Sequence, residues 1–260
     1  MRILAVSDEV DPRLETPLAA RLRPDVLLAA GDLERDYLDY LSNLFEVPLV
    51  FVPGNHDPDL TDLRRSRSGL LLRAGLPAAE IGPAGGINAD GVVVDVAGLR
   101  VGGLGGSIRY RPGPNQYSQR EQARRGRRLV RRAAKARRRD SRDGRDGRDG
   151  RGVDILLTHS PPLGCGDGDD PPHQGFEALY AVVDALQPRL LLHGHIHPYG
   201  QPAPDRFLGG TRVVNVVGHK LLELPDRAAA SPTALREGGD REKLGRYAPQ
   251  DSPRLRREGR

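Results

Sequence analysis

Short apolar runs alternate with amphipathic segments along the first 57 residues of the chain. The apolar runs, at 3–6, 26–30 and 49–52, end at Ser7, Gly31 and Pro53, which is typical of buried strands. Segments 12–23 and 34–45 between them carry leucines at helical spacing, which predicts helices with one buried face. Strand, helix, strand, helix, strand is the beginning of an α/β fold with parallel strands.

The same alternation resumes after a less regular stretch. Residues 60–86 show a mixed pattern rich in loop signals, whereas 92–96 and 99–104 flank Ala97-Gly98 and predict a hairpin. A glycine-rich turn at 102–107 follows, with a spacing unlike that of a phosphate-binding loop. The remaining predicted elements are helices at 118–139 and 176–186 and strands at 153–157, 190–192, 212–217 and 220–224.

The composition suggests one domain with a tail. Of the 260 residues, 37% are hydrophobic and only 4% are aromatic, which is low for a globular protein. We expect a folded domain over 1–224 and a disordered tail over 225–260, where the chain is polar and interrupted by prolines. The single Cys165 excludes an intrachain disulfide and a cysteine-based zinc site. We find no signal peptide and no apolar span of membrane length, so we expect a cytoplasmic protein without membrane contact.

The helix predicted over 118–139 is strongly basic. It has eleven basic residues and one acidic residue, Glu121, in a chain whose net charge is +5. Such a helix suits a nucleic-acid surface, but it has no aromatic residue to stack on bases, so we favour a solvated charged helix and keep the other interpretation open. Residues 143–150 repeat arginine, aspartate and glycine and are expected to be a mobile linker. Helix and linker together would form an insertion over about 118–152.

Metal-ligand residue types follow five of the predicted strands. Because the carboxyl ends of parallel strands meet at one edge of a sheet, ligands bind there. Carboxylate, amide and imidazole groups are ligands that manganese, iron and zinc accept. The residues at these ends are Asp8, Asp32, Asn55, His56, His159, His195 and His197.

Five segments in this order resemble the motif series of the calcineurin-like metallophosphoesterases. They are Asp8, Gly31-Asp32, Gly54-Asn55-His56-Asp57, His159 and Gly194-His195-Ile196-His197. The resemblance implies an α/β fold of four layers, an αββα sandwich of two mixed sheets flanked by helices. It also implies a dinuclear centre with two divalent metal ions, for which Mn, Fe and Zn are the expected choices.

The resemblance assigns a role to each residue. Asp32 would bridge the metals, Asp8 and His197 would hold the first ion, and Asn55, His159 and His195 would hold the second. The ions would activate a water for attack on the phosphorus of a phosphomonoester or phosphodiester. As catalytic residues, His56 would donate to the leaving oxygen and Asp57 would orient a histidine, although a turn-capping role is open for Asp57.

One position departs from the family pattern. The first motif is usually Asp-any-His, and Val10 stands here in the place of the histidine. The first ion would lose a nitrogen ligand, so it could be weakly held, absent, or completed by Glu9, Asp11 or His173. Glu9 would point to the opposite face if the strand were regular, which makes Asp11 or His173 the favoured substitute.

These observations support three functions. The leading one is a metallophosphoesterase that hydrolyses a small-molecule or nucleotide phosphoester. A catalytically weakened scaffold used for protein binding is favoured by Val10 and opposed by the retained His56. A nuclease or nucleic-acid-binding role would act through the arginine-rich helix. The sequence leaves the substrate and the oligomeric state open.

Overall fold

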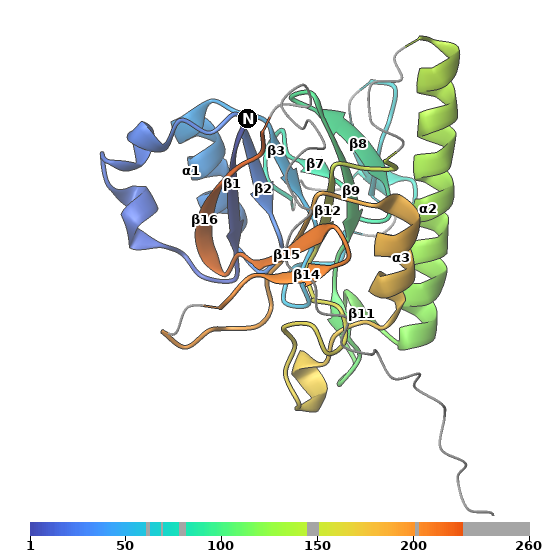
Figure 1. The fold of residues 1–260 in the computed structure, drawn as a ribbon. Helices are drawn as coiled ribbons and strands as arrows, with labels where there is room; N and C mark the ends of the chain where they lie inside the picture. The colour runs from blue at the N-terminus through green and yellow to red at the C-terminus, as the bar shows by residue number, and fades with distance from the viewer. Residues whose placement is uncertain (61–62, 69, 78–81, 145–150, 201–202, 226–260) are drawn as a thin grey trace, which may run out of the picture. The chain divides into compact units, whose positions relative to one another are not determined.

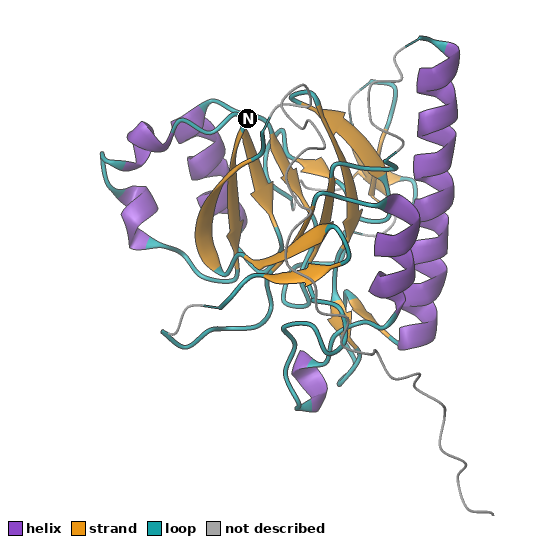
Figure 2. Ribbon diagram, in the orientation of Figure 1, coloured by secondary structure: helices purple, strands orange, loops and turns teal. Residues whose placement is uncertain are grey.

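A computed structural model of the chain describes residues 1–60, 63–68, 70–77, 82–144, 151–200 and 203–225. Within it, Met1–Asp226 form one compact unit. In this unit two β-sheets face each other, and helices lie on their outer sides (Figures 1 and 2). The tail expected over 225–260 lies outside the described residues apart from Pro225.

The first sheet contains the three strands predicted near the N-terminus. Its order is β16 (Gly218–Glu223), β1 (Arg2–Ser7), β2 (Val26–Ala29), β3 (Leu49–Phe51) and β7 (Ile87–Asn88). Strands β1, β2, β3 and β7 run parallel, and β16 pairs antiparallel with β1. The carboxyl ends of β1, β2 and β3 therefore share one edge, as the alternation of elements predicts.

The second sheet is built from the later part of the chain. Its order is β14 (Arg206–Leu208), β15 (Thr211–Asn215), β13 (Leu190–His193), β12 (Ile155–Thr158), β9 (Leu99–Leu104) and β8 (Val93–Val96). The four central strands are parallel, and the two edge strands are antiparallel to their neighbours. The hairpin expected around Ala97-Gly98 is the β8–β9 pair, in which Asp95 faces Arg100.

Three apolar clusters hold the layers together. One lies between the sheets and contains Ile3, Leu28 and Val50 with Val101, Ile155 and Leu192. A second packs α2 (Gln119–Arg142) and α3 (Ala178–Leu186) on the second sheet, and a third packs α1 (Arg35–Phe45) on the first. Since alternate strand residues face opposite sides, each sheet contributes to two clusters. This is the expected αββα sandwich (Figure 1).

Two stretches differ from the sequence prediction. The helix expected over 12–23 is wrong, because the chain forms two short 3₁₀ helices, Pro12–Glu15 and Ala19–Leu22. Pro17 explains the break, since it forces the preceding Thr16 into an extended conformation. The mixed region over 60–86 contains a small antiparallel sheet of β4 (Leu63–Arg65), β5 (Leu71–Arg73) and β6 (Leu76–Pro77), whose two- and three-residue strands are too short to give a periodic signal.

The basic helix α2 is 24 residues long and begins with a capping box. Ser118 accepts from the amide of Glu121, whose carboxylate accepts from the Ser118 amide at 2.8 Å. Its apolar stripe, with Leu129 and Ala133, is buried on the second sheet and α3. Arg125 pairs with Asp90, so some of the positive charges serve the fold. The linker predicted to follow lies mostly at 145–150, outside the described residues.

Three short elements complete the described chain. They are β10 (Ser107–Ile108), β11 (Gln116–Tyr117) and a 3₁₀ helix at Pro171–His173. Among the described residues, no helix is long and apolar enough to cross a membrane.

Candidate metal centre

Three candidate ligands lie where the backbone turns sharply out of a strand. Asp8, Asp32 and His195 follow β1, β2 and β13 and have φ angles of 59°, 56° and 68°. Left-handed conformations are costly for residues other than glycine, and they concentrate at functional sites. Here they turn two carboxylates and one imidazole toward a common point.

Two glycines make room for this convergence. A Cβ atom on Gly54 would overlap the Asp32 carboxylate and the His159 ring, and one on Gly194 would overlap Ser7 and the Asp8 carboxylate. The glycines of both motifs are therefore needed for the close approach of backbone to ligand.

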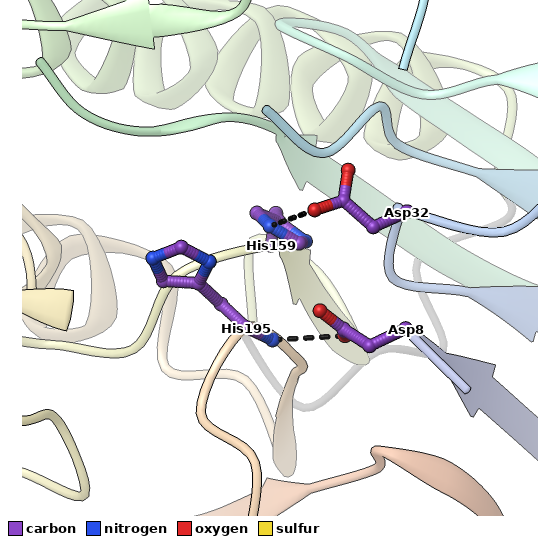
Figure 3. Close-up of side chains that lie close together, drawn as sticks. All are labelled: Asp8, Asp32, His159 and His195. Atoms are coloured by element: carbon purple, nitrogen blue, oxygen red, sulfur yellow. Dashed lines mark hydrogen bonds and ion pairs between the residues drawn. The ribbon is translucent and has the colours of Figure 1, made fainter. Parts of the chain in front are cut away.

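The side chains of Asp8, Asp32, His159 and His195 form a compact group (Figure 3). Each offers one ligand atom, and these atoms all lie within 4.8 Å of one another. The Asp8 and Asp32 side chains are 4% and 8% exposed, and both histidines are buried. Residues far apart in the sequence thus meet at the edge where the strands of both sheets end.

His159 is held with one nitrogen committed and the other aimed into the site. Its Nδ1 donates to the carbonyl of Ala30 at 2.7 Å, while Nε2 lies 3.2 Å from Asp32 Oδ2 and 3.1 Å from Asn55 Oδ1. Burial alone would lower the pKa of His159, but the charges of Asp32 and Asp8 outweigh it and raise the pKa to about 9. The two carboxylates therefore favour positive charge at His159 Nε2, as a proton or as a metal ion.

His195 is arranged in the same manner. Its Nε2 donates to the carbonyl of Pro172 at 2.8 Å, which leaves the lone pair on Nδ1, and its ring centre lies 4.8 Å from that of His159. Burial, together with the positive charge of His159, lowers the pKa of His195 to about 3. The ring is neutral, as a metal ligand must be, and a carbonyl partner on the other nitrogen is the usual support for such a ligand.

The carboxylates and Asn55 complete a donor set that fits a divalent ion. Burial raises the pKa of Asp8; burial acts in the same direction on Asp32, but the charge of His159 outweighs it and lowers the pKa. Asn55 is 3% exposed, and its Nδ2 is buried with no hydrogen-bond partner among the described residues. A proton on His159 satisfies only one position among these oxygens and nitrogens, whereas a divalent ion would accept several of them at once.

His197 lies at the margin of this group. Its Nε2 is 3.9 Å from Asp8 Oδ1, its side chain is 35% exposed, and its Nδ1 is hydrogen-bonded to Glu9 Oε1 at 2.7 Å. The expectation that Glu9 points away is wrong, because β1 ends at Ser7 and the left-handed Asp8 redirects the chain. Val10 is 47% exposed.

The two favoured substitutes for the missing histidine have other partners. Asp11 is bonded to Arg13 and to His219, and the Arg13 guanidinium holds the pKa of that carboxyl well below its usual range. His173 lies with its ring centre 5.4 Å from that of His195, but its Nδ1 is bonded to Asp170. Asp11 is thus engaged in an ion pair, and His173 lies next to His195, which the resemblance assigns to the second ion.

The loop that carries His56 and Asp57 is tied to Asp32. The His56 amide donates to Asp32 Oδ1 at 2.8 Å, and the His56 side chain is exposed. Asp57 Oδ2 accepts from the amides of Gly54 at 2.7 Å and Asp32 at 2.9 Å. This geometry favours the turn-capping role of Asp57 over the orientation of a histidine.

Sequence reasoning missed several supporting groups. Ser7 Oγ donates to Asp8, and the carbonyls of Ala30 and Pro172 fix the two buried histidines. Carbonyl contacts leave no signal in residue identity. The Asn115 side chain donates to the carbonyl of Asp57 at 3.0 Å, and its place in a polar loop gave only a weak hint.

The model of the family described as calcineurin-like phosphoesterase matches residues 1–199. The chain belongs to the calcineurin-like phosphoesterase family. This membership supports, at the level of the family, a metal-dependent hydrolase acting on phosphate esters, and the buried Asp/His group fits that class.

Several solved structures are similar to this chain at low sequence identity. One matches with a TM-score of 0.50 and 14% identity, covering 85% of this chain and 98% of its own. The protein TT1561 of Thermus thermophilus matches with a TM-score of 0.47 and 17% identity, covering 82% of this chain and 88% of its own. A 5′-nucleotidase precursor from the same organism matches with a TM-score of 0.37 and 16% identity, covering 83% of this chain and 48% of its own. A comparison with curated protein sequences gave no match.

Proposed function

We propose that this protein hydrolyses a phosphomonoester or phosphodiester of a small molecule at a dinuclear metal centre, for which manganese is our first choice. The observation that carries the proposal is the convergence of His159 Nε2, Asn55 Oδ1 and Asp32 Oδ2, with the last two within 3.2 Å of the nitrogen. When His159 is neutral these atoms all offer lone pairs. A proton on Nε2 can serve one of these contacts, whereas a divalent ion would accept several of these atoms at once.

The second ion position is the better defined of the two. Asn55, His159 and His195 would hold it with Asp32, and both imidazoles have the tautomer fixed by a carbonyl. The first position would use Asp8, Asp32 and His197, with Glu9 bonded to the far nitrogen of His197. Ions bound there would supply a Lewis acid for the phosphate oxygens and a water of lowered pKa.

The residues of the chain then have separate tasks. Asp32, which is buried, would hold both ions and provide the negative charge that keeps two cations close. His56 is exposed beside Asp32 and tied to it through its amide, so its ring is available to donate a proton to the leaving oxygen. Asp57 links that loop to the turn at Asp32, because its carboxylate accepts hydrogen bonds from the amides of Gly54 and Asp32.

Hydrolysis of nitrophenyl phosphomonoesters and phosphodiesters with added manganese tests the proposal. Asp32→Asn removes a charge without changing shape, and His56→Ala removes the proton donor. Asp184→Asn, an exposed carboxylate on α3, is the matched control. We expect metal-dependent turnover in the wild type and the control, and a loss of at least about a hundredfold in kcat for both site variants.

Metal content provides the second readout. We expect about two equivalents per wild-type chain by elemental analysis after equilibration with manganese, and fewer in Asp32→Asn. No metal-dependent turnover on either ester in the wild type would contradict the proposal and favour the protein-binding scaffold.

A further inference from the structure

A pocket of about 410 Å³ opens beside the candidate metal centre and shares three residues with it. Asp32, His56 and Asp57 line the pocket as well as the site. The other walls come from the first turn of α1, the end of β3, the loop that follows it and the segment at Gly82-Pro83. The pocket therefore lies on the α1 side of the first sheet, next to the residue we place at the leaving oxygen.

The wall of the pocket is mostly apolar. Leu33, Leu38, Phe51, Leu60 and Pro83 contribute to it. Leu33, Leu38 and Phe51 are 5 to 7% exposed and belong to the cluster between α1 and the first sheet. The pocket is open to solvent, and its volume of about 410 Å³ lies in the range of small-molecule sites.

The charged residues of the wall are already engaged within the protein. Arg35 Nε is bonded to Asp39 at 3.2 Å, and the Asp57 carboxylate accepts from two backbone amides. Glu34 is exposed at the start of α1. Because these charges have partners or face solvent, the interior of the pocket suits an uncharged organic group.

We propose that this pocket binds an aromatic ring carried on the leaving-group side of the phosphoester, such as an aryl group or a nucleobase. The assignment rests on the proposed function, because it uses the position of His56 beside the leaving oxygen. The wall contains Phe51 together with proline and leucine side chains, which offer aromatic and aliphatic contact to a ring. The metal centre would then select for phosphate and the pocket for the group that is released.

Gly82 offers a way to fill the pocket without rebuilding the site. Among the described residues, a Cβ atom there would meet Phe51 Cζ alone, at 3.5 Å, which is an ordinary contact. Gly82→Leu should therefore be tolerated and should place its side chain against Phe51. Gly210 lies in open space between β14 and β15, so Gly210→Leu is the matched control.

The experiment compares three esters that share a phosphate and differ in the leaving group: 1-naphthyl phosphate, adenosine 5′-phosphate and methyl phosphate. If the wild type hydrolyses only diesters, the corresponding methyl diesters replace them. For each ester the ratio of kcat/KM between variant and wild type is measured, which removes differences in intrinsic reactivity. Binding of free 1-naphthol and of adenosine to each protein is measured by calorimetry.

We expect Gly82→Leu to lower kcat/KM at least tenfold for one or both aromatic esters while methyl phosphate stays within twofold of wild type. The ester whose kcat/KM falls identifies whether the pocket binds an aryl group or a nucleobase. Gly210→Leu should change none of them by more than twofold. Leu60→Ala, which shortens one wall, should weaken the aromatic esters in the same selective way and serves if Gly82→Leu unfolds at a lower temperature than wild type.

Equal effects of Gly82→Leu on all three esters, or no effect on any, would overturn the pocket assignment and leave the proposed hydrolysis standing. If the wild type hydrolyses no ester, the proposed function fails, and the binding measurements decide the pocket by themselves. In that case naphthol or adenosine binding that Gly82→Leu abolishes supports an aromatic pocket, and its absence in the wild type rejects one.

Discussion

Replacing Asp57 by alanine should lower the free energy of unfolding, and it should have little direct effect on kcat in protein that remains folded. The carboxylate accepts two backbone amides, from Gly54 at 2.7 Å and from Asp32 at 2.9 Å. A hydrogen bond to a charged group contributes about 1.5–3 kcal/mol, so two of them set an upper range of about 3–6 kcal/mol. Burial raises the pKa of Asp57 although the two amide bonds lower it, so desolvation offsets the gain from the charge itself. The loss on truncation then comes from the two amides left without an acceptor, at about 1–3 kcal/mol each. We therefore expect a loss of about 2–3 kcal/mol in the free energy of unfolding.

Urea unfolding followed by circular dichroism measures this loss, in excess chelator so that metal binding does not contribute. Asp57→Asn keeps one acceptor oxygen without the charge and should lose about 1 kcal/mol. Asp184→Ala, an exposed carboxylate on α3, should unfold at the wild-type urea midpoint. The decisive comparison is with turnover measured where all variants are folded.

An unchanged urea midpoint in Asp57→Ala, with kcat reduced at least about a hundredfold, would refute this reasoning. It would show that the carboxylate acts in the chemistry, as the orientation of a histidine requires. A drop in stability with a parallel loss of metal affinity would instead support its role in holding the Asp32 turn against the loop of His56.

Three further predictions follow from individual contacts. Glu9→Gln should weaken metal binding about 10- to 100-fold in a chelator competition assay, because it removes the carboxylate charge bonded to His197. The control Glu15→Gln, on an exposed 3₁₀ turn, should leave metal binding unchanged. Equal effects of the two variants would reject a role for the Glu9–His197 pair in metal binding. Gly54→Ala should lower metal affinity more than tenfold, since the new Cβ overlaps Asp32 and His159; wild-type affinity would contradict this. Hydrogen bonds from the Ser118 amide and hydroxyl, and then from Arg109, lower the pKa of Glu121 to about 2. The stability that the Glu121 carboxylate contributes is therefore complete above its ordinary pKa of 4.5 and is lost as the pH falls toward 2. The difference in melting temperature between wild type and Glu121→Ala should shrink below pH 4.5, and a difference independent of pH would contradict this account.

The strands and most helices could be predicted from periodicity because their burial is one-sided or complete. Runs such as Leu190–His193 are buried on both faces, which is typical of strands in a parallel sheet covered on both sides. The helix prediction for 12–23 was wrong because it rested on the leucine spacing, whereas Pro17 makes Thr16 extended. A steric rule about one residue outweighed a pattern spread over twelve.

The candidate site was predictable as a set of residue types and not as a geometry. Strand ends placed Asp8, Asp32, His159 and His195 at one edge, and the structure brings their ligand atoms within 4.8 Å. The tautomers of the histidines depend on the carbonyls of Ala30 and Pro172. Every residue has a carbonyl, so only the folded chain shows which one is used.

The first ion position shows where residue-type reasoning stops. Strand alternation placed Glu9 on the far face, yet the strand ends at Ser7 and the left-handed Asp8 brings the Glu9 carboxylate to 2.7 Å from His197 Nδ1. The same turn that aims Asp8 into the site therefore also supplies an anion to the histidine left without its usual neighbour. A carboxylate on the far nitrogen of a histidine ligand fixes the orientation of its ring. Under the proposed function, Glu9 would hold His197 in this way at the position where Val10 offers no nitrogen, and the affinity of Glu9→Gln for metal, rather than the sequence motif, decides whether this position holds an ion.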